Sequence, residues 1–468
     1  MSEIAIQPIP SAPGLFDRAL RKITGVWRDM ASSVSRDEDD DIEAQMRACL
    51  NGRGGEVSAR NRAAKLAETY LSLDAAGQLG FLSAVASFDS DVEAINAAHA
   101  QLTAAKDEAE RAAAKSALRR ALEPPRVRLL TQFTTIPDGM KFIVELRTKL
   151  LAIMKGDPHL TALEADMRAL LANWFDVGFL ELQSIDWNSP AALLEKLVGY
   201  EAVHEIRSWR DLKNRLDSDR RCYAFFHPRM PHEPLIFVEV ALVKGLADSV
   251  QRLLDQKAPV QNPREADAAI FYSISNCQRG LAGISFGNFL IKRVVTELSA
   301  EFHNLKIFAT LSPIPGFRRW LAQQISADDD TLLLEEEETK TLQALEVADT
   351  GTKSLEALLN RRGWCRDPAI TKPLEPILIR LCARYLLAES RGKRAADPVA
   401  HFHLSNGARI ERINMGADIS EKGLKESAGL MVNYLYAPDK IETYHEDYAG
   451  EGRRHASTVV RKLARGWA

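Results

Sequence analysis

The sequence predicts an α+β protein of two domains, an all-α helical bundle followed by a domain of α/β type. Residues 42–180 carry apolar side chains almost entirely at helical spacing. Near residue 180 the pattern changes, and runs rich in aromatic and β-branched residues begin. Residues 269–317 then give a strand, a glycine-containing loop, a helix and a strand, the order of a βαβ unit. We therefore expect a helical domain over residues 1–185 and an α/β domain over residues 186–468.

The helical domain combines an apolar stripe at 14–33 with four longer segments rich in Ala, Leu, Glu, Lys and Arg. Pro124-Pro125 ends the second segment, because proline cannot continue a helix. We find no convergent set of polar side chains here, so we expect this bundle to serve packing or assembly. The four segments span 58–88, 92–122, 138–154 and 158–175.

The βαβ unit places a candidate anion site at the start of its helix. The strand Ala269–Ile274 leads into a loop that contains Gly280, Gly283 and Gly287, and helical spacing begins near Phe289. Backbone N–H groups at a helix N-terminus bind phosphates. Neither the Walker sequence nor G-x-G-x-x-G is present. The loop is therefore either a pyrophosphate cradle of the acyl-CoA type or a plain turn between strand and helix.

The elements around this unit complete the predicted domain. Ser312 follows its second strand, Ile307–Leu311, and no G-x-S-x-G elbow surrounds the serine. Ser405-Asn406-Gly407 predicts a hairpin turn between two strands within Asp397–Met415. An acidic, solvated insertion is expected at 327–348. Further strands are expected at Cys222–Phe226 and Leu235–Val243, and helices at 190–198, 207–216, 244–256, 317–325, 353–362, 372–389, 420–434 and 453–466.

Composition excludes several classes of protein. The 468 residues are 46% hydrophobic with a net charge of −3, which gives no electrostatic case for binding nucleic acid. Five cysteines without a C-x-x-C pair suit free thiols in a reducing compartment. No apolar run approaches the length of a membrane span, and no secretory h-region follows Met1. Glu3, Asp17 and Asp29 argue against a transit peptide, and the Arg-Gly-Trp-Ala end is not a peroxisomal signal.

Histidines provide the candidate groups for proton transfer. In a strand, His401 and His403 would share a face and could hold a metal ion. No Cys, Asp or Glu lies at close ligand spacing, so we favour one histidine as a proton donor and expect no metal. His227, His232 and Glu233 also suggest a metal site, but their Pro-rich setting favours a solvated loop.

Basic residues near the loop are the candidate phosphate ligands. Among Arg279, Lys292 and Arg293, the arginine beside the glycines is the better candidate. Lys292 and Arg293 also fit the polar surface of the helix that follows.

Several strings resemble the malonyl-CoA decarboxylase family. They include Leu311–Phe317, reading LSPIPGF, and Phe402–Ala408, reading FHLSNGA, together with Phe271–Ser275, Gly280–Gly283 and Gly429–Tyr434. The likeness is strong over residues 190–468. The resemblance implies a catalytic domain of GNAT acyltransferase type, homo-oligomers (commonly tetramers) assembled partly through the helical domain, and conversion of malonyl-CoA to acetyl-CoA and CO2 without a cofactor. We therefore expect a cytoplasmic lyase of fatty acid metabolism.

The same resemblance assigns the site. It implies that Ser312 and His403 are catalytic. Some relatives carry an acidic residue where this chain has Ser285, so a mechanism that needs a carboxylate there is not available. Arg279 and Tyr434 are added as candidates from the residues themselves, with Asn433 as a weaker one. The acyl-CoA contacts fall on Ala282, Gly283, Ile284, Ser285, Phe286, Gly287, Asn288 and Ile291.

These residues suit a decarboxylation that passes through a thioester enolate. We expect His403 to protonate the carbon and Ser312 to orient the carboxylate, while the CoA phosphates on the loop anchor the small malonyl group. Two alternatives use the same fold. One is an N-acyltransferase that passes the acyl group to an amine, and the other is a non-catalytic acyl-CoA sensor.

Overall fold

The computed structural model describes residues 25–31, 41–51, 55–284, 289–327, 333–345 and 348–465. The first part of the chain is entirely helical there, as predicted. The predicted segment 58–88 is divided at Asp74 and the segment 92–122 at Asp107, because each aspartate caps a new helix with its side chain. The helices are α2 (Ile42–Leu50), α3 (Glu56–Ser72), α4 (Ala75–Ser87), α5 (Val92–Ala104), α6 (Glu108–Leu122), α7 (Pro125–Phe133), α8 (Gly139–Ile153) and α9 (Pro158–Trp174).

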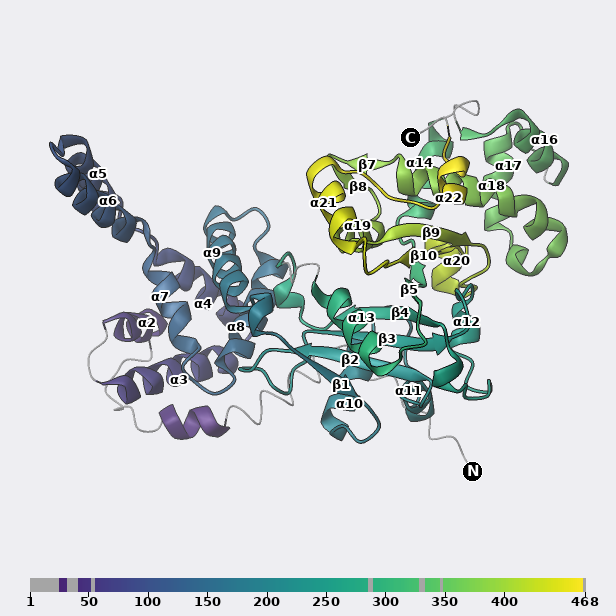
Figure 1. Ribbon diagram of the computed structural model, residues 1–468. Helices are drawn as coiled ribbons and strands as arrows, with labels where there is room; N and C mark the ends of the chain where they lie inside the picture. Colours follow the sequence, from purple (N-terminus) through teal and green to yellow (C-terminus); the bar gives the residue numbers. More distant parts are fainter. Residues whose placement is uncertain are drawn as a thin grey trace.

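Helices α5 and α6 form a hairpin that projects from the bundle (Figure 1). Within this pair of helices only Ala98 and Ala114 are buried. The other helices surround an apolar core that includes Phe81, Phe133 and Phe142. The hairpin therefore lies outside the packed core.

An eight-stranded mixed sheet forms the centre of the second part, in the order β1-β2-β3-β4-β5-β10-β6, with β9 paired to β10. Neighbouring strands are antiparallel except β4 and β5, which run parallel and are joined through α13 (Phe289–Glu301). The predicted βαβ unit is confirmed. The strands are β1 (Glu181–Ile185), β2 (Arg220–Phe226), β3 (Ile236–Val243), β4 (Ala268–Asn276), β5 (Ile307–Thr310), β6 (Ser312–Pro313), β9 (Arg409–Asn414) and β10 (Met431–Leu435).

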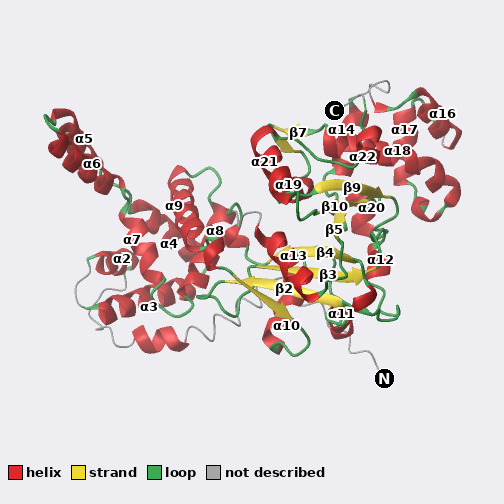
Figure 2. Ribbon diagram, viewed as in Figure 1, coloured by secondary structure: helices red, strands yellow, loops and turns green. Residues whose placement is uncertain are grey.

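Helices cover this sheet and form a further layer around its last strands (Figure 2). A small hairpin of β7 (Ser390–Arg391) and β8 (Arg394–Ala395) lies beside them. The predicted α+β class, a helical domain followed by an α/β domain, is confirmed. The helices are α10 (Ala191–Tyr200), α11 (Trp209–Arg215), α12 (Val250–Leu253), α14 (Phe317–Ser326), α16 (Glu336–Leu345), α17 (Gly351–Asn360), α18 (Pro368–Leu387), α19 (Pro398–Ser405), α20 (Glu421–Ser427), α21 (Ile441–Glu451) and α22 (Thr458–Leu463).

The predicted hairpin within Asp397–Met415 is wrong. Residues Pro398–Ser405 form α19, and only Arg409–Asn414 is a strand. The Asp397 side chain accepts hydrogen bonds from the N–H groups of Val399 and Ala400, and Pro398 occupies the first turn. Such a start signal outweighs the β preference of the side chains that follow.

Four other predicted segments differ from the structure. The helix expected at 453–466 begins only at Thr458, after the Ser457 cap. The helix expected at 244–256 is a single turn at Val250–Leu253, begun by the Ser249 cap. The helix expected at 420–434 ends at Ala428, which has a left-handed backbone, and β10 follows. The acidic insertion at 327–348 contains helix α16, with three glutamates in its first turn, where they complement the helix dipole.

The sheet divides between β4 and β5. Pairing of the two strands stops at Phe271 and Thr310, although β4 continues to Asn276. Beyond that point Ser312 pairs instead with Val432 of β10. Ligands of α/β sheets bind where neighbouring chains diverge in this way. Ser312 therefore lies at the place in the sheet where a substrate is expected.

Within the residues that the structure describes, no helix is long and apolar enough to cross a membrane.

Candidate active site

Ser312 and His403 are brought together at the division of the sheet. The Ser312 Oγ lies 2.9 Å from the His403 Nε2, although the two residues are 91 positions apart. Both side chains are buried, with 6% and 3% of their surface exposed. A hydroxyl and an imidazole at this distance can exchange a proton.

Asp397 fixes the helix that carries His403. One carboxylate oxygen caps α19, and the other accepts a hydrogen bond from the N–H of Gly316 at 3.1 Å. Gly316 belongs to the segment that follows Ser312. A Cβ on Gly316 would lie 2.0 Å from the Tyr385 hydroxyl, so the close approach requires glycine. Asp397 thus ties the two halves of the serine–histidine pair through one carboxylate. Burial raises the pKa of Asp397, although its hydrogen bonds oppose the shift.

The far side of the imidazole contacts Tyr436, whose hydroxyl lies 2.8 Å from the His403 Nδ1. Tyr436 is 1% exposed. A buried hydroxyl that does not donate its hydrogen bond is costly. The arrangement that satisfies it has Tyr436 donating to Nδ1, which leaves the His403 proton on Nε2 and directed at Ser312.

Thr310 and Tyr434 hold the pair from the sheet side. The Ser312 hydroxyl donates to the Thr310 Oγ1 at 2.9 Å, and the N–H of Tyr434 donates to the same oxygen. The Tyr434 ring stacks on the His403 ring with a centroid separation of 4.5 Å. Because the Ser312 O–H donates its hydrogen bond to Thr310, the Ser312 oxygen can accept a hydrogen bond from the His403 Nε2–H.

Burial dominates the electrostatics of this site. It lowers the pKa of His403 to about 3 and raises the pKa of Tyr436 well above its usual value. The imidazole is therefore neutral at physiological pH. A neutral ring with its proton on Nε2 can donate that proton to a strongly basic carbanion.

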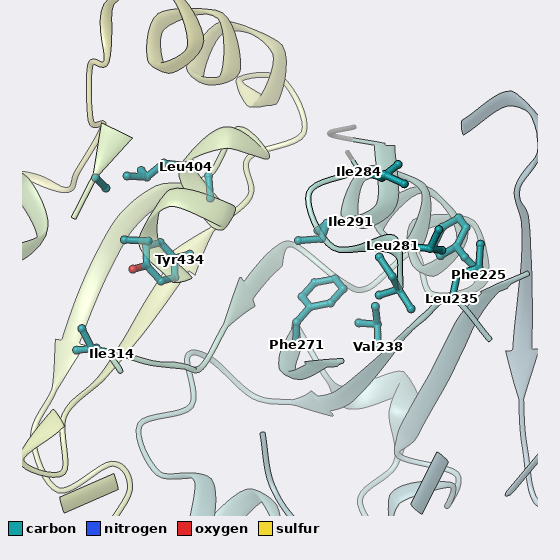
Figure 3. Close-up of a cluster of buried hydrophobic side chains, with 14 of the residues drawn as sticks. Phe225, Leu235, Val238, Phe271, Leu281, Ile284, Ile291, Ile314, Leu404 and Tyr434 are labelled. Carbon is teal, nitrogen blue, oxygen red and sulfur yellow. The ribbon is translucent and has the colours of Figure 1, made fainter. Parts of the chain in front are cut away.

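The start of the predicted loop and Tyr434, whose ring stacks on His403, belong to one cluster of buried apolar side chains. Figure 3 shows Leu281, Ile284 and Ile291 on the side of β4, with Tyr434 opposite them. Ile284 and Ile291 are buried, while Ala282 and Gly283 are exposed. Gly283 has a φ of 76°, a backbone conformation that favours glycine. Ser285, Phe286, Gly287 and Asn288 lie outside the described residues.

The other candidates lie apart from the serine–histidine pair. Lys292 pairs with Glu442, and His401 contacts the Tyr448 hydroxyl at 2.8 Å. Arg279 is exposed beside the start of the loop, and its role as a phosphate ligand stays a prediction. Asn433 donates hydrogen bonds to the carbonyls of Thr310 and Ala247, so it supports the strand that precedes Ser312.

The solvated loop predicted for His227, His232 and Glu233 is wrong for two of its members. His227 is buried against the carbonyl of Trp174, and Glu233 is buried in an ion pair with Lys196. His232 is exposed. Across the described ranges, no three His, Cys, Asp or Glu side chains come together as a metal site.

Sequence reasoning missed the roles of Tyr436, Thr310 and Asp397. Period-two spacing places Tyr436 on the face of Tyr434, and Thr310 on the face of Ser312. Asp397-Pro398 is a helix start signal. These signals were present, but only the fold shows that Tyr436 contacts the His403 ring, Thr310 contacts the Ser312 hydroxyl, and Asp397 joins the segments that carry the pair.

Fold and site together define a two-domain enzyme with a buried serine–histidine pair at the division of a mixed sheet. Comparison with known proteins gives its family. Residues 178–467 match the model of the malonyl-CoA decarboxylase C-terminal domain, and residues 88–175 match that of the N-terminal domain. The chain belongs to the malonyl-CoA decarboxylase family, and the resemblance predicted from the sequence is confirmed.

Individual relatives agree over most of the chain. A mitochondrial malonyl-CoA decarboxylase of the goose Anser anser anser is 39% identical over 347 residues, which cover 72% of this chain and 69% of the relative. The crystal structure of malonyl-CoA decarboxylase from Rhodopseudomonas palustris is 42% identical with a TM-score of 0.81, covering 90% of this chain and 99% of that one. The corresponding Agrobacterium vitis structure is 41% identical with a TM-score of 0.81, covering 91% and 99%.

Proposed function

We propose that this chain is a carboxy-lyase that converts malonyl-CoA to acetyl-CoA and CO2, with Ser312 and His403 as its catalytic residues. The observation that carries the proposal is the 2.9 Å contact between the Ser312 Oγ and the His403 Nε2, buried at the division of the sheet. The names of the homologues supply the substrate. The side chains supply the chemistry.

Decarboxylation needs a sink for the electrons of the broken carbon–carbon bond. The thioester carbonyl provides it, because the electrons move onto its oxygen as an enolate when the carboxylate stands out of the thioester plane. Ser312 can hold that carboxylate by turning its O–H from Thr310 toward the substrate, while its oxygen still accepts a hydrogen bond from the His403 Nε2–H. Burial of the pair favours this step. A carboxylate that has lost its hydration is higher in free energy, which lowers the cost of converting it to neutral CO2.

The enolate carbon then needs a proton. His403 donates its Nε2 proton. The transfer leaves a negative charge on the ring, which the Tyr436 hydroxyl stabilises through its hydrogen bond to Nδ1. The site recovers one proton from water before the next turnover. The net reaction consumes malonyl-CoA and one proton and releases acetyl-CoA and CO2.

The direct test mixes the purified chain with malonyl-CoA and no amine, and measures acetyl-CoA and CO2. We expect equal amounts of both products, with Ser312→Ala and His403→Asn lowering kcat by about 10²–10⁴. An unchanged thioester would exclude decarboxylation. If acyl transfer appeared only after an amine was added, the acyltransferase alternative would replace this function. If the thioester were unchanged but raised the melting temperature, a sensor would replace it.

Assembly and domain limits are further parts of this proposal. We propose a homo-oligomer, a tetramer in the form predicted from the sequence, located in the cytoplasm. Its helical domain and catalytic domain would meet just before β1, a few residues earlier than the boundary at 185 that the sequence predicted. Strand β1 pairs with β2, and the two family models meet between residues 175 and 178, which supports placing β1 with the catalytic domain. Light scattering after size exclusion tests the tetramer, and limited proteolysis tests the boundary.

A further inference from the structure

Helix α8 of the helical domain reaches into the start of the glycine loop. Its Arg147 is 1% exposed and donates from Nη1 to the Gly280 carbonyl at 2.6 Å and from Nη2 to the Ala282 carbonyl at 2.9 Å. The same guanidinium pairs with Glu164 of α9 at 2.6 Å. One side chain of the helical domain therefore holds two peptides of the catalytic domain.

The approach of α8 is close and specific. A Cβ on Gly280 would lie 1.8 Å from the Val144 carbonyl oxygen, so only glycine fits there. One turn earlier on the helix, Lys141 donates to the Gln278 side chain at 2.7 Å. Gln278 in turn donates to the Pro234 carbonyl at 2.8 Å. These contacts thus hold residues 278–282 in a fixed position against α8.

This contact decides the direction of a peptide in the predicted phosphate loop. In a trans peptide the C=O and the following N–H point in opposite directions. Because Arg147 binds the Ala282 carbonyl, the Gly283 N–H points away from Arg147. Ala282 and Gly283 are both exposed, so a ligand can reach this peptide. A backbone N–H fixed in this way is a donor for a phosphate oxygen.

We propose that Arg147 is a positioning residue for substrate binding, which orients the Ala282–Gly283 peptide so that its N–H binds the CoA diphosphate. The inference rests on the proposed function, because it takes the loop as the CoA site. Arginine suits the role since its planar fork donates to two carbonyls and a carboxylate at once, whereas the lysine ammonium is a point charge. The helical domain then contributes to substrate affinity.

The test compares Arg147→Met and Arg147→Lys with a matched control, Arg126→Met. Arg126 is a buried arginine of α7 that also pairs with a carboxylate of α9, Asp166, and also donates to a carbonyl, that of Ala86. These contacts all lie in the helical domain. Turnover of malonyl-CoA, affinity for CoA by calorimetry, and melting temperature are measured for each variant.

Both Arg147 variants should raise the KM for malonyl-CoA and the Kd for CoA about tenfold or more, while kcat stays within about threefold of wild type. Arg126→Met should lower the melting temperature and leave both constants unchanged. If Arg147→Met fails to fold, Arg147→Lys decides, since it keeps the charge beside Glu164. A wild-type Kd for CoA in a folded Arg147 variant would overturn the proposal, as would an equal change in Arg126→Met.

A truncated substrate separates positioning from general damage. Malonyl-pantetheine has the reacting thioester but no diphosphate. Its kcat/KM should be the same in wild type and in Arg147→Lys, and an equal loss with both substrates would contradict a role at the diphosphate. If wild type failed to decarboxylate malonyl-CoA yet bound CoA in an Arg147-dependent way, the proposed function would fail and this inference would stand.

Discussion

At the scale of single residues, the state of the His403 ring depends on the hydroxyl behind it. Tyr436 donates to Nδ1 and so keeps the imidazole proton on Nε2, where Ser312 accepts it. The resemblance of two short strings placed Ser312 and His403 in one site, and the structure brings them into contact. Tyr436 was not predicted, because a helix was expected at 420–434, and only strand β10 brings the residue that follows it beside His403.

Tyr436→Phe tests this arrangement. Removing the hydroxyl frees the ring to adopt the other neutral form, with its proton on Nδ1. We expect kcat to fall about 10- to 100-fold while KM stays unchanged, since the altered group assists proton transfer and does not bind CoA. Steady-state kinetics measure both constants. The matched control is Tyr448→Phe, which removes a hydroxyl from the other histidine of α19, His401, and should leave kcat unchanged.

The pH dependence of folding follows from the same burial. The pKa of His403 falls from an ordinary 6.5 to about 3, so between these values the unfolded chain binds a proton that the folded chain does not. The neutral His403 ring therefore makes its full contribution to the free energy of unfolding above pH 6.5. This contribution is lost as the pH falls toward 3. Urea unfolding at a series of pH values measures it.

The comparison for that experiment is His403→Gln, which has no titrating group at this position. Its free energy of unfolding should fall less steeply with decreasing pH than that of wild type. In the wild-type spectrum, the His403 ring resonances should not titrate between about pH 5 and 8. A midpoint inside that window would contradict a neutral buried imidazole.

At the scale of elements, α19 shows where pattern reasoning failed and why. The alternating residues before Asn406-Gly407 predicted a hairpin, but Asp397-Pro398 begins a helix. The cap also bonds Gly316, far away in sequence, so the helix start is stabilised by a contact that no local pattern contains. By contrast, the βαβ unit was predictable, because its strand and helix signals are local and agree with one another.

Asp397→Ala should therefore lower the free energy of unfolding by more than the loss of an ordinary helix cap does. Loss of a cap costs about 1 kcal/mol, and loss of the bond to Gly316 adds to it. The control is Asp91→Ala, which removes an equivalent cap of α5, where the carboxylate accepts from Glu93 and Ala94. We expect a larger loss of unfolding free energy and of kcat for Asp397→Ala. Equal stability losses with wild-type kcat in both would show that Asp397 acts only as a cap.

At the scale of the whole molecule, the two parts share one apolar core. A continuous set of buried residues runs from Trp27 and Phe142 of the bundle through Leu281 to Tyr434. The sequence predicted the two domains but not their contact, because the α8 residues Lys141 and Arg147 have the spacing of any amphipathic helix. Which carbonyls they would meet depends on the fold of a segment more than 130 positions away.

This shared core predicts a single unfolding transition. Calorimetry should give one peak for wild type, with the calorimetric and van't Hoff enthalpies in agreement. Gly280→Ala, which places a Cβ against the Val144 carbonyl, should lower the melting temperature and separate the two parts. Gly80→Ala is the control, since it lies inside α4 with nothing within 4 Å of the added carbon. Two peaks in wild type would contradict the shared core.

Decarboxylation of malonyl-CoA by the Ser312–His403 pair is the activity proposed for this enzyme. The most direct measurement is single-turnover decarboxylation by wild type, Ser312→Ala and His403→Asn, with CoA affinity measured on the same samples. We predict equal acetyl-CoA and CO2 from wild type, a loss of about 10²–10⁴ in rate for each variant, and unchanged CoA affinity. Wild-type rates in both folded variants would contradict the account.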